Sequence, residues 1–217
     1  MNNKIDLIVF DLDGTLLESS STIYKSVIKT FEHLNKKVHL PKEELEKRIG
    51  MHFKPFFEEL NIPIDDFEEF INIYKKYYFD FIDETKIYPG VKDTLEILKE
   101  NGFKLAVLTT KVQDQTEKII DHFKMSFYFN VLMGRRDGIE FKPSAEPLLL
   151  ICKELNISPV NTLMVGDSEL DIRCGKNAGA FTCGTLYGHR TKEILENENP
   201  DYIINSFDEL KDILKSD

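Results

Sequence analysis

"FDLDGTL" occupies residues 10–16 and places two aspartates directly after an apolar run. The run itself, "KIDLIV" at residues 4–9, is short and mostly aliphatic, which indicates a strand buried on both faces. The acids at its end are Asp11 and Asp13. They either cap a turn or take part in chemistry, and the rest of the chain has to distinguish these two possibilities.

Outside residues 17–86, strand-like apolar runs alternate with amphipathic runs of helical spacing. For example, "FKLAVLTT" (103–110) is followed by "VQDQTEKIIDHF" (112–123). Alternation of this kind predicts a parallel sheet with helices on both faces, so we expect a doubly wound, Rossmann-like α/β domain. A late run, "DYIINSF" (201–207), predicts a last strand at an edge of the sheet.

The segment 17–86 differs in kind from the rest of the chain. Its two patterned stretches, "STIYKSVIKTFEHL" (21–34) and "DDFEEFINIYKKYYFDFIDE" (65–84), have apolar residues at helical spacing, and we expect no strand in the segment. The aromatic residues of the second stretch are typical of a packing surface rather than of a ligand site. An ordinary βα loop has about 2–6 residues, so this insertion is too long to be one. We therefore predict an α/β core of residues 1–16 and 87–217, with an inserted all-helical cap of residues 17–86.

The composition favours a small substrate over a charged polymer. The chain of 217 residues is 41% hydrophobic and 30% charged, enough for a globular protein with one core and an inserted part. Its net charge is −10, and no cluster of Lys and Arg interrupts the acidic balance. Nucleic acid and an anionic membrane surface are therefore disfavoured as partners. We expect a monomer or a homodimer.

Membrane and secretion signals are absent from the sequence. The longest wholly apolar stretch, "LLLIC" (148–152), is far shorter than the roughly 20 residues of a membrane span. The N-terminal segment enters its predicted strand almost at once, which leaves no room for a leader peptide. Cys152, Cys174 and Cys183 form no C-x-x-C pair, so we expect buried thiols rather than disulfides or a zinc site. We predict a cytoplasmic protein.

Polar residues gather where the predicted strands end. An open parallel sheet binds its ligands outside the carboxyl ends of its strands, near the point where the strand order reverses. Four carboxylates, two hydroxyls and one lysine follow such strands: Asp11 and Asp13, Thr109 and Thr110, Asp167 with Asp171 one helical turn later, and Lys142 on a loop. We expect these groups to share one edge of the sheet.

The spacing of the first two acids has a geometric meaning. On an extended chain residues i and i+2 point the same way, so Asp11 and Asp13 can face one pocket while Leu12 turns toward the core. Gly14 then lets the backbone turn sharply beside the substrate. Carboxylates held this close raise one another's pKa, and a bound cation would stabilise their ionised forms. Mg²⁺ prefers oxygen ligands and often keeps a substrate phosphate in its shell.

A pocket that combines carboxylates, Mg²⁺, a lysine and a hydroxyl suits phosphoryl transfer, in which positioning and charge stabilisation dominate. An aspartate can itself be the nucleophile and form an aspartyl-phosphate. Its partner two residues later is then well placed as acid and base. The sequence therefore predicts phosphoryl chemistry on a small phosphorylated substrate.

Four segments resemble the four motifs of the haloacid dehalogenase-like hydrolases: "DLDGTL" (11–16), "LTTK" (108–111), "EFKPSAEP" (140–147) and "VGDSELD" (165–171). The chain resembles in particular the phosphoglycolate phosphatase-like branch, which has a helical cap between the first and second motifs. The tail "AGAFTCGTLYGHR" (178–190) is similar to the family's fifth strand and following loop, so the resemblance covers essentially the whole chain. The commonest pattern, K-P-x-P-x-P, has here an alanine in place of the middle proline.

The resemblance implies roles for the residues that match these motifs. Asp11 would attack phosphorus, and Asp13 would protonate the leaving group and then activate the water that hydrolyses the aspartyl-phosphate. Thr109 and the backbone at Thr110 would hold the transferring phosphoryl group. Thr110 stands where the family often has asparagine. Lys142 would neutralise charge on Asp11 and on the phosphate.

The resemblance also implies a metal site. Mg²⁺ would be held by the Asp11 side chain, the Asp13 backbone carbonyl and Asp167. Asp171 would orient a metal-bound water or Lys142. Ser168 is a further candidate in this outer layer, although capping of the following helix explains it equally well.

Three other functions share parts of this pattern. A phospho-accepting receiver protein also combines an aspartate, a hydroxyl and a lysine, but it is about half this length and needs no cap. Within the family, a sugar-phosphate mutase and an inorganic pyrophosphatase have similar motifs. The fate of the phospho-enzyme separates these functions: it lasts seconds or less with Mg²⁺ in a phosphatase, lasts much longer in a receiver, and passes its phosphoryl group to a sugar phosphate in a mutase.

Substrate choice is expected to depend on the cap, because the strand ends handle only the phosphoryl group. The segment "RIGMHFKPFF" (48–57) interrupts a helical pattern at its glycine and again near its proline. We hypothesise that Met51, His52 and Lys54 contact the leaving group, although a plain connection between two helices fits the same pattern. The two arginines of "MGRRDG" (133–138) are further candidates for contact with an anionic substrate.

Overall fold

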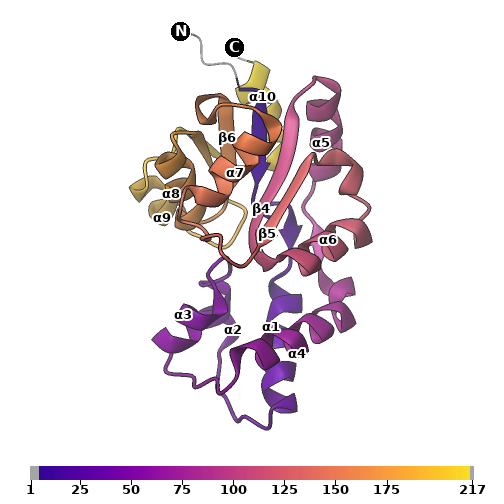
Figure 1. The fold of residues 1–217 in the computed structure, drawn as a ribbon, viewed down its shortest axis with the longest axis vertical. Coiled ribbons are helices and arrows are strands. Elements are labelled where there is room, and N and C mark those ends of the chain that lie inside the picture. Colours follow the sequence, from indigo (N-terminus) through magenta and orange to yellow (C-terminus); the bar gives the residue numbers. More distant parts are fainter. Residues whose placement is uncertain (1–4, 216–217) are drawn as a thin grey trace.

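The computed structural model describes residues 5–215 and has two parts, an α/β core and a helical cap below it (Figure 1). The core is built on a six-stranded parallel sheet with the strand order β5-β4-β1-β6-β7-β8. The predicted doubly wound α/β fold is confirmed. The strands are β1 (Leu7–Phe10), β4 (Lys104–Val112), β5 (Val131–Arg135), β6 (Thr162–Gly166), β7 (Phe181–Thr185) and β8 (Tyr202–Ile204).

Helices cover both faces of this sheet. All four residues of β1 are fully buried, as the apolar run predicts. Leu7 and Val9 pack with α7 and α8, whereas Ile8 and Phe10 pack with α5, α6 and α10 on the other face. Burial of one such side chain stabilises the fold by roughly 1.5–3 kcal/mol. The helices of the core are α5 (Val91–Glu100), α6 (Gln113–His122), α7 (Glu146–Leu155), α8 (Glu169–Ala178), α9 (Lys192–Asn197) and α10 (Leu210–Lys215), with 3₁₀ turns at Ser126–Tyr128, Pro159–Asn161 and Phe207–Glu209.

The edge strand and the cysteines follow the sequence prediction. β8 lies at the edge of the sheet beside β7, inside the run that predicts a last strand. All three cysteines are free and buried, as expected. Within residues 5–215, no helix is both long and apolar enough to cross a membrane.

The cap consists of helices packed around aromatic rings. Phe31 of α1 lies 5.4 Å from Phe57 of α3 and 5.2 Å from Phe70 of α4, measured between ring centroids. The aromatic stripe on α4 is therefore mainly a packing surface, as predicted. Asp66 caps α4, because its Oδ1 accepts a hydrogen bond from the Glu69 N–H at 3.0 Å. The helices are α1 (Ser20–His33), α2 (Lys42–Glu46), α3 (Phe53–Glu59) and α4 (Phe67–Asp80), followed by a 3₁₀ turn at Ile82–Glu84.

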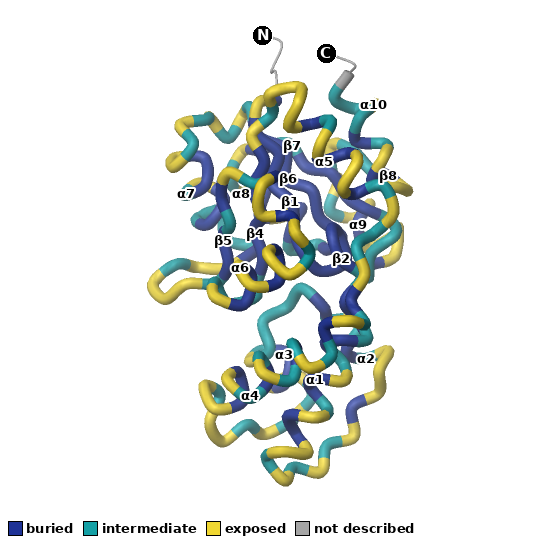
Figure 2. The backbone as a smooth tube through the Cα atoms, turned by 90° about the vertical axis from the view of Figure 1, so that its right-hand side faces the viewer, coloured by how far each residue is buried: buried dark blue, intermediate teal, exposed yellow. Residues whose placement is uncertain are grey.

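A short ribbon joins the cap to the core and corrects one expectation. β2 (Leu17–Glu18) pairs antiparallel with β3 (Lys86–Ile87), so the segment 17–86 does contain strand residues at its two ends. The chain leaves the core and returns to it at neighbouring points, which brings the two backbones into hydrogen-bonding range. Figure 2 shows β2 at the junction between the two parts. Two residues are too few to produce a periodic signal in the sequence.

The proline of the cap loop also behaves differently from the expectation. Pro55 is the third residue of α3 and does not interrupt it. The first turn of a helix tolerates proline, because the missing N–H has no partner within the helix at that position. The connection between α2 and α3 therefore ends at His52, which caps α3 by accepting a hydrogen bond from the Lys54 N–H on its Nδ1.

Candidate active site

The three central strands bring the predicted residues to one edge of the sheet. β1 lies between β4 and β6, and the strand order reverses at this point. Asp11 and Asp13 follow β1, Thr109 and Thr110 lie near the end of β4, and Asp167 follows β6 directly. The carboxyl ends of parallel strands meet at the same edge, so the sheet itself assembles the site.

Three carboxylates converge at this edge. Asp11, Asp167 and Asp171 each offer one oxygen within 4.8 Å of the others, and none of the three residues is more than 2% exposed. Lys142 lies among them, with its Nζ 2.8 Å from Asp11 Oδ1 and 2.6 Å from Asp171 Oδ1. One buried cation therefore faces three buried acids.

The charges of this cluster are strongly perturbed. Burial raises the pKa of the Asp11 carboxyl well above its usual range, and the adjacent Lys142 opposes that effect. Burial, followed by the charge of Asp171, raises the pKa of Asp167 to about 7. Burial favours the neutral amine of Lys142, but the two flanking carboxylates outweigh it and raise the pKa of this lysine. Lys142 is therefore a permanent cation, whereas full ionisation of Asp11 and Asp167 needs positive charge beyond that of this lysine.

The residues present fit a divalent cation. Asp11 Oδ2 is buried and has no hydrogen-bond partner among the described residues. A carboxylate oxygen of this kind costs free energy unless a ligand satisfies it. Three oxygen donors within a few ångströms of one another are the ligand type that Mg²⁺ prefers. Asp11 and Asp167 are accordingly the side chains best placed to hold such an ion.

Gly14 and Gly188 allow two loops to approach Asp167 closely. Gly14 has φ +85°, and a Cβ added to it would lie 2.3 Å from Asp167 Oδ2. A Cβ on Gly188 would lie 2.2 Å from Asp167 Cβ. The His189 N–H donates a hydrogen bond to Asp167 Oδ2 at 2.7 Å. Gly14, which is predicted to lie at the substrate, lies against Asp167. Any side chain at this position would clash with that carboxylate.

Ser168 and Asp171 form a pair at the start of α8. The Ser168 N–H and Oγ both donate to Asp171 Oδ2, at 3.0 Å and 2.6 Å. The second oxygen of Asp171 then accepts from Lys142. Ser168 therefore acts in helix capping, one of its two expected roles, and through Asp171 it also fixes the direction of Lys142.

Asp13 lies apart from the carboxylate cluster. Its Oδ1 accepts from Ser19 Oγ at 2.5 Å, and its Oδ2 lies 3.0 Å from Lys111 Nζ. Lys111 is nearly buried, and its ammonium group also sits 4.5 Å above the ring of Tyr78. Lys111 belongs to the quoted "LTTK" motif, but sequence reasoning assigned it no role. The sequence did indicate a place for it: Lys111 stands two residues after Thr109, and side chains two residues apart on a strand point to the same side.

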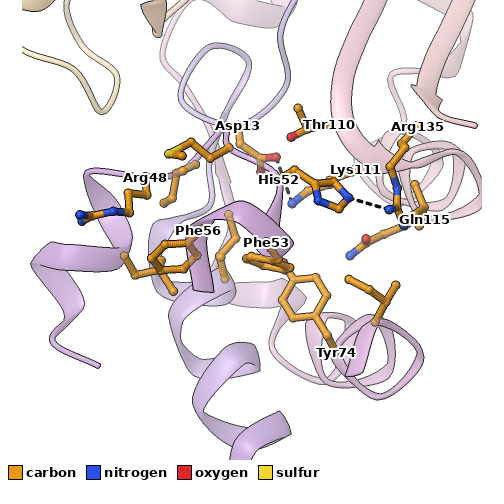
Figure 3. A pocket seen from close by; sticks show the side chains of 17 residues that line it. Asp13, Arg48, His52, Phe53, Phe56, Tyr74, Thr110, Lys111, Gln115 and Arg135 are labelled. Atoms are coloured by element: carbon orange, nitrogen blue, oxygen red, sulfur yellow. Dashed lines mark hydrogen bonds and ion pairs between the residues drawn. The ribbon is translucent and has the colours of Figure 1, made fainter. Parts of the chain in front are cut away.

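The cavity beside Asp13 lies between the cap and the core (Figure 3). Met51 and His52, which are hypothesised to contact the leaving group, both line this cavity. Lys54 does not line it; the residue is exposed and its backbone N–H bonds to His52. Thr110 lines the cavity on the core side, whereas Thr109 is buried at 4% exposure and accepts a hydrogen bond from the Lys111 N–H.

His52 connects the cap to the core. Its Nε2 lies 2.6 Å from Arg135 Nη1, and its ring stacks on Phe141 with centroids 5.1 Å apart. The structure separates the two candidate arginines, since Arg135 lines the cavity and Arg136 is exposed and donates to the Leu132 carbonyl. The conformation seen here therefore has the cap closed on the core through His52.

Arg190 makes a second connection that sequence reasoning missed. This residue is 6% exposed, and its Nη2 donates to the Ile49 carbonyl of the cap at 3.1 Å. Its Nε donates to Glu169 Oε2 at 2.8 Å. Arg190 ends the quoted tail segment, but a lone arginine in a loop carries no local signal that would reveal a partner in the cap.

We predict that His52 titrates far below an ordinary histidine. Burial of the ring, followed by the charges of Arg135 and Lys54, lowers the pKa of His52 from 6.5 to about 4. Because the unfolded chain takes up the proton first, the contribution of His52 to stability is complete above about pH 6.5 and is lost as the pH falls toward 4. Histidine NMR resonances followed against pH measure this value directly. Arg135→Gln should raise it and Arg136→Gln should not, whereas a wild-type value of 6.5 or more contradicts the contact.

Comparisons with known proteins agree with this geometry. Residues 8–185 match the family model described as haloacid dehalogenase-like hydrolase. The chain is 35% identical to the phosphoglycolate phosphatase of Aquifex aeolicus over 201 residues, covering 92% of each protein. It is 34% identical to the pyrophosphatase PpaX of Halalkalibacterium halodurans over 212 residues, covering 97% of each. The crystal structure of a "predicted phosphatase from Clostridium acetobutylicum" matches with a TM-score of 0.82 at 32% identity, covering 98% of this chain and 99% of that one.

Proposed function

Since the chain belongs to the haloacid dehalogenase-like hydrolases and is a phosphatase of their phosphoglycolate phosphatase-like branch, we propose that it hydrolyses a small phosphorylated metabolite through an aspartyl-phosphate on Asp11. The environment of Asp11 is the observation that supports this most. One of its oxygens is held by Lys142 at 2.8 Å, and the other is buried with no partner among the described residues. A nucleophile needs this combination of a fixed direction and an available oxygen.

In the first step, the Asp11 carboxylate attacks phosphorus, and the bond between phosphorus and the leaving-group oxygen breaks. Asp13 enters this step in its protonated form and gives that proton to the leaving-group oxygen. In the second step, Asp13 takes a proton from a water molecule that attacks the aspartyl-phosphate, which releases inorganic phosphate and restores Asp11. Ser19 and Lys111 hold one oxygen each of the Asp13 carboxylate, which supports its assignment as a directed acid and base.

Thr109 and the backbone at Thr110 are proposed to hold the transferring phosphoryl group, and Lys142 to neutralise its charge. Asp171 is proposed to position Lys142, with which it pairs at 2.6 Å, rather than a metal-bound water. Mg²⁺ would be held by the carboxylates of Asp11 and Asp167 with the Asp13 backbone carbonyl, and it would supply positive charge beside the phosphate oxygens.

Inorganic pyrophosphate is the second candidate substrate. The relative from Halalkalibacterium halodurans is named a pyrophosphatase, and the cavity beside Asp13 contains three cationic side chains, from Arg48, Lys111 and Arg135. A phospho-accepting receiver is no longer a candidate, because the match to the hydrolase family covers residues 8–185. A sugar-phosphate mutase would differ in passing its phosphoryl group to a sugar phosphate and not to water.

The deciding experiment is phosphate release from a substrate panel in the presence of Mg²⁺. The panel contains 2-phosphoglycolate, pyrophosphate, nucleoside monophosphates, sugar phosphates and p-nitrophenyl phosphate. We expect release from the smallest substrates at rates that turn the enzyme over many times. A single equivalent of phosphate retained on the protein, with no continued release, would contradict the hydrolase and point to the mutase.

A further inference from the structure

The cavity between cap and core has two unlike walls. In Figure 3 the cap supplies rings, among them Phe53, Phe56 and Tyr74, below the cavity. The core supplies polar side chains from the end of β4, from α6 and from β5, and these lie on the opposite side: Thr110, Lys111, Gln115 and Arg135. A ligand in this cavity would therefore meet apolar surface on one side and hydrogen-bond donors on the other.

The charges of the lining residues are not balanced. Asp13 is the only acid among them, against three cations. Arg48 is neutralised outside the cavity by Glu44 and Glu59. Lys111 pairs with Asp13 through one of three N–H donors.

Arg135 is the unpaired cation of the cavity. Within residues 5–215, no carboxylate lies within ion-pair distance of it, and its side chain contacts the ring of His52 instead. His52 is uncharged near neutral pH, because its pKa is about 4, so this contact leaves the charge of Arg135 in place. A guanidinium at the edge of a partly closed cavity is a strong site for an oxyanion.

Gln115 provides an independent sign of a missing ligand. The residue is 2% exposed and lines the cavity from the first turns of α6, yet its Nε2 has no hydrogen-bond partner among the described residues. A buried amide N–H₂ without an acceptor costs free energy and is uncommon in folded proteins. An acceptor atom of a bound molecule would remove that cost.

The size of the cavity limits the molecule. Its free volume is about 60 Å³. One water needs roughly 10–15 Å³ by this measure, so the space fits on the order of five heavy atoms. With the cap in this position, a leaving group of that size fits and a nucleoside does not.

We propose that Arg135, Gln115 and Lys111 form a second oxyanion subsite, which selects phosphate compounds whose leaving group is small and itself ends in an oxyanion. The inference rests on the proposed function, because it assigns the scissile phosphoryl group to Asp11 and the remainder of the substrate to this subsite. Asp13 and Thr110 line the cavity and stand close to Asp11 and Thr109 along the chain, which connects the two places. A carboxylate on a two-atom spacer and a second phosphoryl group both have this chemistry and this size.

The test compares substrates that differ only in the second charge. 2-Phosphoglycolate ends in a carboxylate, and 2-hydroxyethyl phosphate is its near-isosteric neutral counterpart; pyrophosphate represents the second phosphoryl group. For the wild type we expect kcat/KM to favour at least one anionic substrate over the neutral one. Arg135→Gln and Gln115→Leu should each reduce that preference by roughly tenfold to a hundredfold, as loss of a hydrogen bond to a charged group does.

Arg136→Gln is the matched control, because Arg136 is the next residue, is exposed and does not line the cavity. It should leave the preference unchanged. Thermal melting of each variant confirms that it is folded, and the use of two variants keeps the test valid if one of them does not fold.

Equal losses on the charged and neutral substrates, or a wild type that prefers 2-hydroxyethyl phosphate to both anionic substrates, would overturn the subsite. Phosphate release by the wild type from any of the three substrates tests the proposed function separately, since the subsite concerns only the ratio between them. The ranking of 2-phosphoglycolate against pyrophosphate identifies which oxyanion the subsite takes.

Discussion

Asp11→Asn is expected to abolish phosphate release and to leave the protein folded. The substitution removes the attacking oxygen anion but keeps the volume of the side chain, in a site that is 2% exposed. Loss of a covalent nucleophile lowers kcat by at least roughly 10³-fold. The fold should tolerate the change, because Lys142 keeps Asp171 as its ionic partner at 2.6 Å. Initial rates on the best substrate and a thermal melt of both proteins measure the two parts of the prediction.

Asp6→Asn is the control for this experiment. Asp6 is exposed and directly precedes β1, so its replacement makes the same chemical change on the same segment without entering the site. It should retain wild-type rates. Activity of Asp11→Asn within tenfold of the wild type would remove Asp11 from the role of nucleophile, and the aspartyl-phosphate with it.

We expect removal of divalent metal to abolish the activity and added Mg²⁺ to restore it. Burial raises the pKa of Asp11 and of Asp167, so their ionised forms need positive charge beyond that of Lys142, and Asp11 Oδ2 has no partner among the described residues. Treatment with EDTA should therefore stop phosphate release. Binding of Mg²⁺ well above its dissociation constant stabilises the fold by about 2–3 kcal/mol, which in a protein of this size raises the melting temperature by on the order of 5 °C.

The melting temperature gives this prediction a readout that is independent of turnover. Asp167→Asn should lose most of the rise caused by Mg²⁺, because a neutral amide is a weaker ligand than a carboxylate. Asp137→Asn, on an exposed loop, should keep it. Full activity in metal-free buffer, or an equal rise in Asp167→Asn and wild type, would count against the site.

The two connections between cap and core bear on how the substrate enters. Arg190 donates to the Ile49 carbonyl, and His52 contacts Arg135 and Phe141. Both contacts involve residues 49–52 of the cap, which also border the cavity. The same short loop therefore contacts the core and borders the space for the leaving group. Opening of the cap in each turnover would break these contacts together, which links substrate entry to the residues that surround the substrate.

Local patterns predicted the parts of the structure that repeat with a short period. The buried strand β1 could be predicted because it consists of four consecutive apolar residues, and the structure buries all four. The two long helices of the cap, α1 and α4, could be predicted because their apolar residues recur every three or four positions. The two-residue ribbon of β2 and β3 could not, since it depends on where the chain enters and leaves the core.

For the candidate site, the sequence alone was enough to locate most of the polar groups, because the residues that follow parallel strands necessarily meet at one edge of a sheet. The order of the motifs along the chain was enough to indicate the family. Only the tertiary structure decided which of these groups touch. It placed Asp13 with Lys111 and away from the cluster of Asp11, Asp167 and Asp171, and it brought Arg135 but not Arg136 to the cavity. The physical reason is that each of these contacts joins side chains far apart in sequence. The distances within the site depend on how the strands pair and how their loops fold over the end of the sheet, and the lining of the cavity depends on how the cap packs on the core.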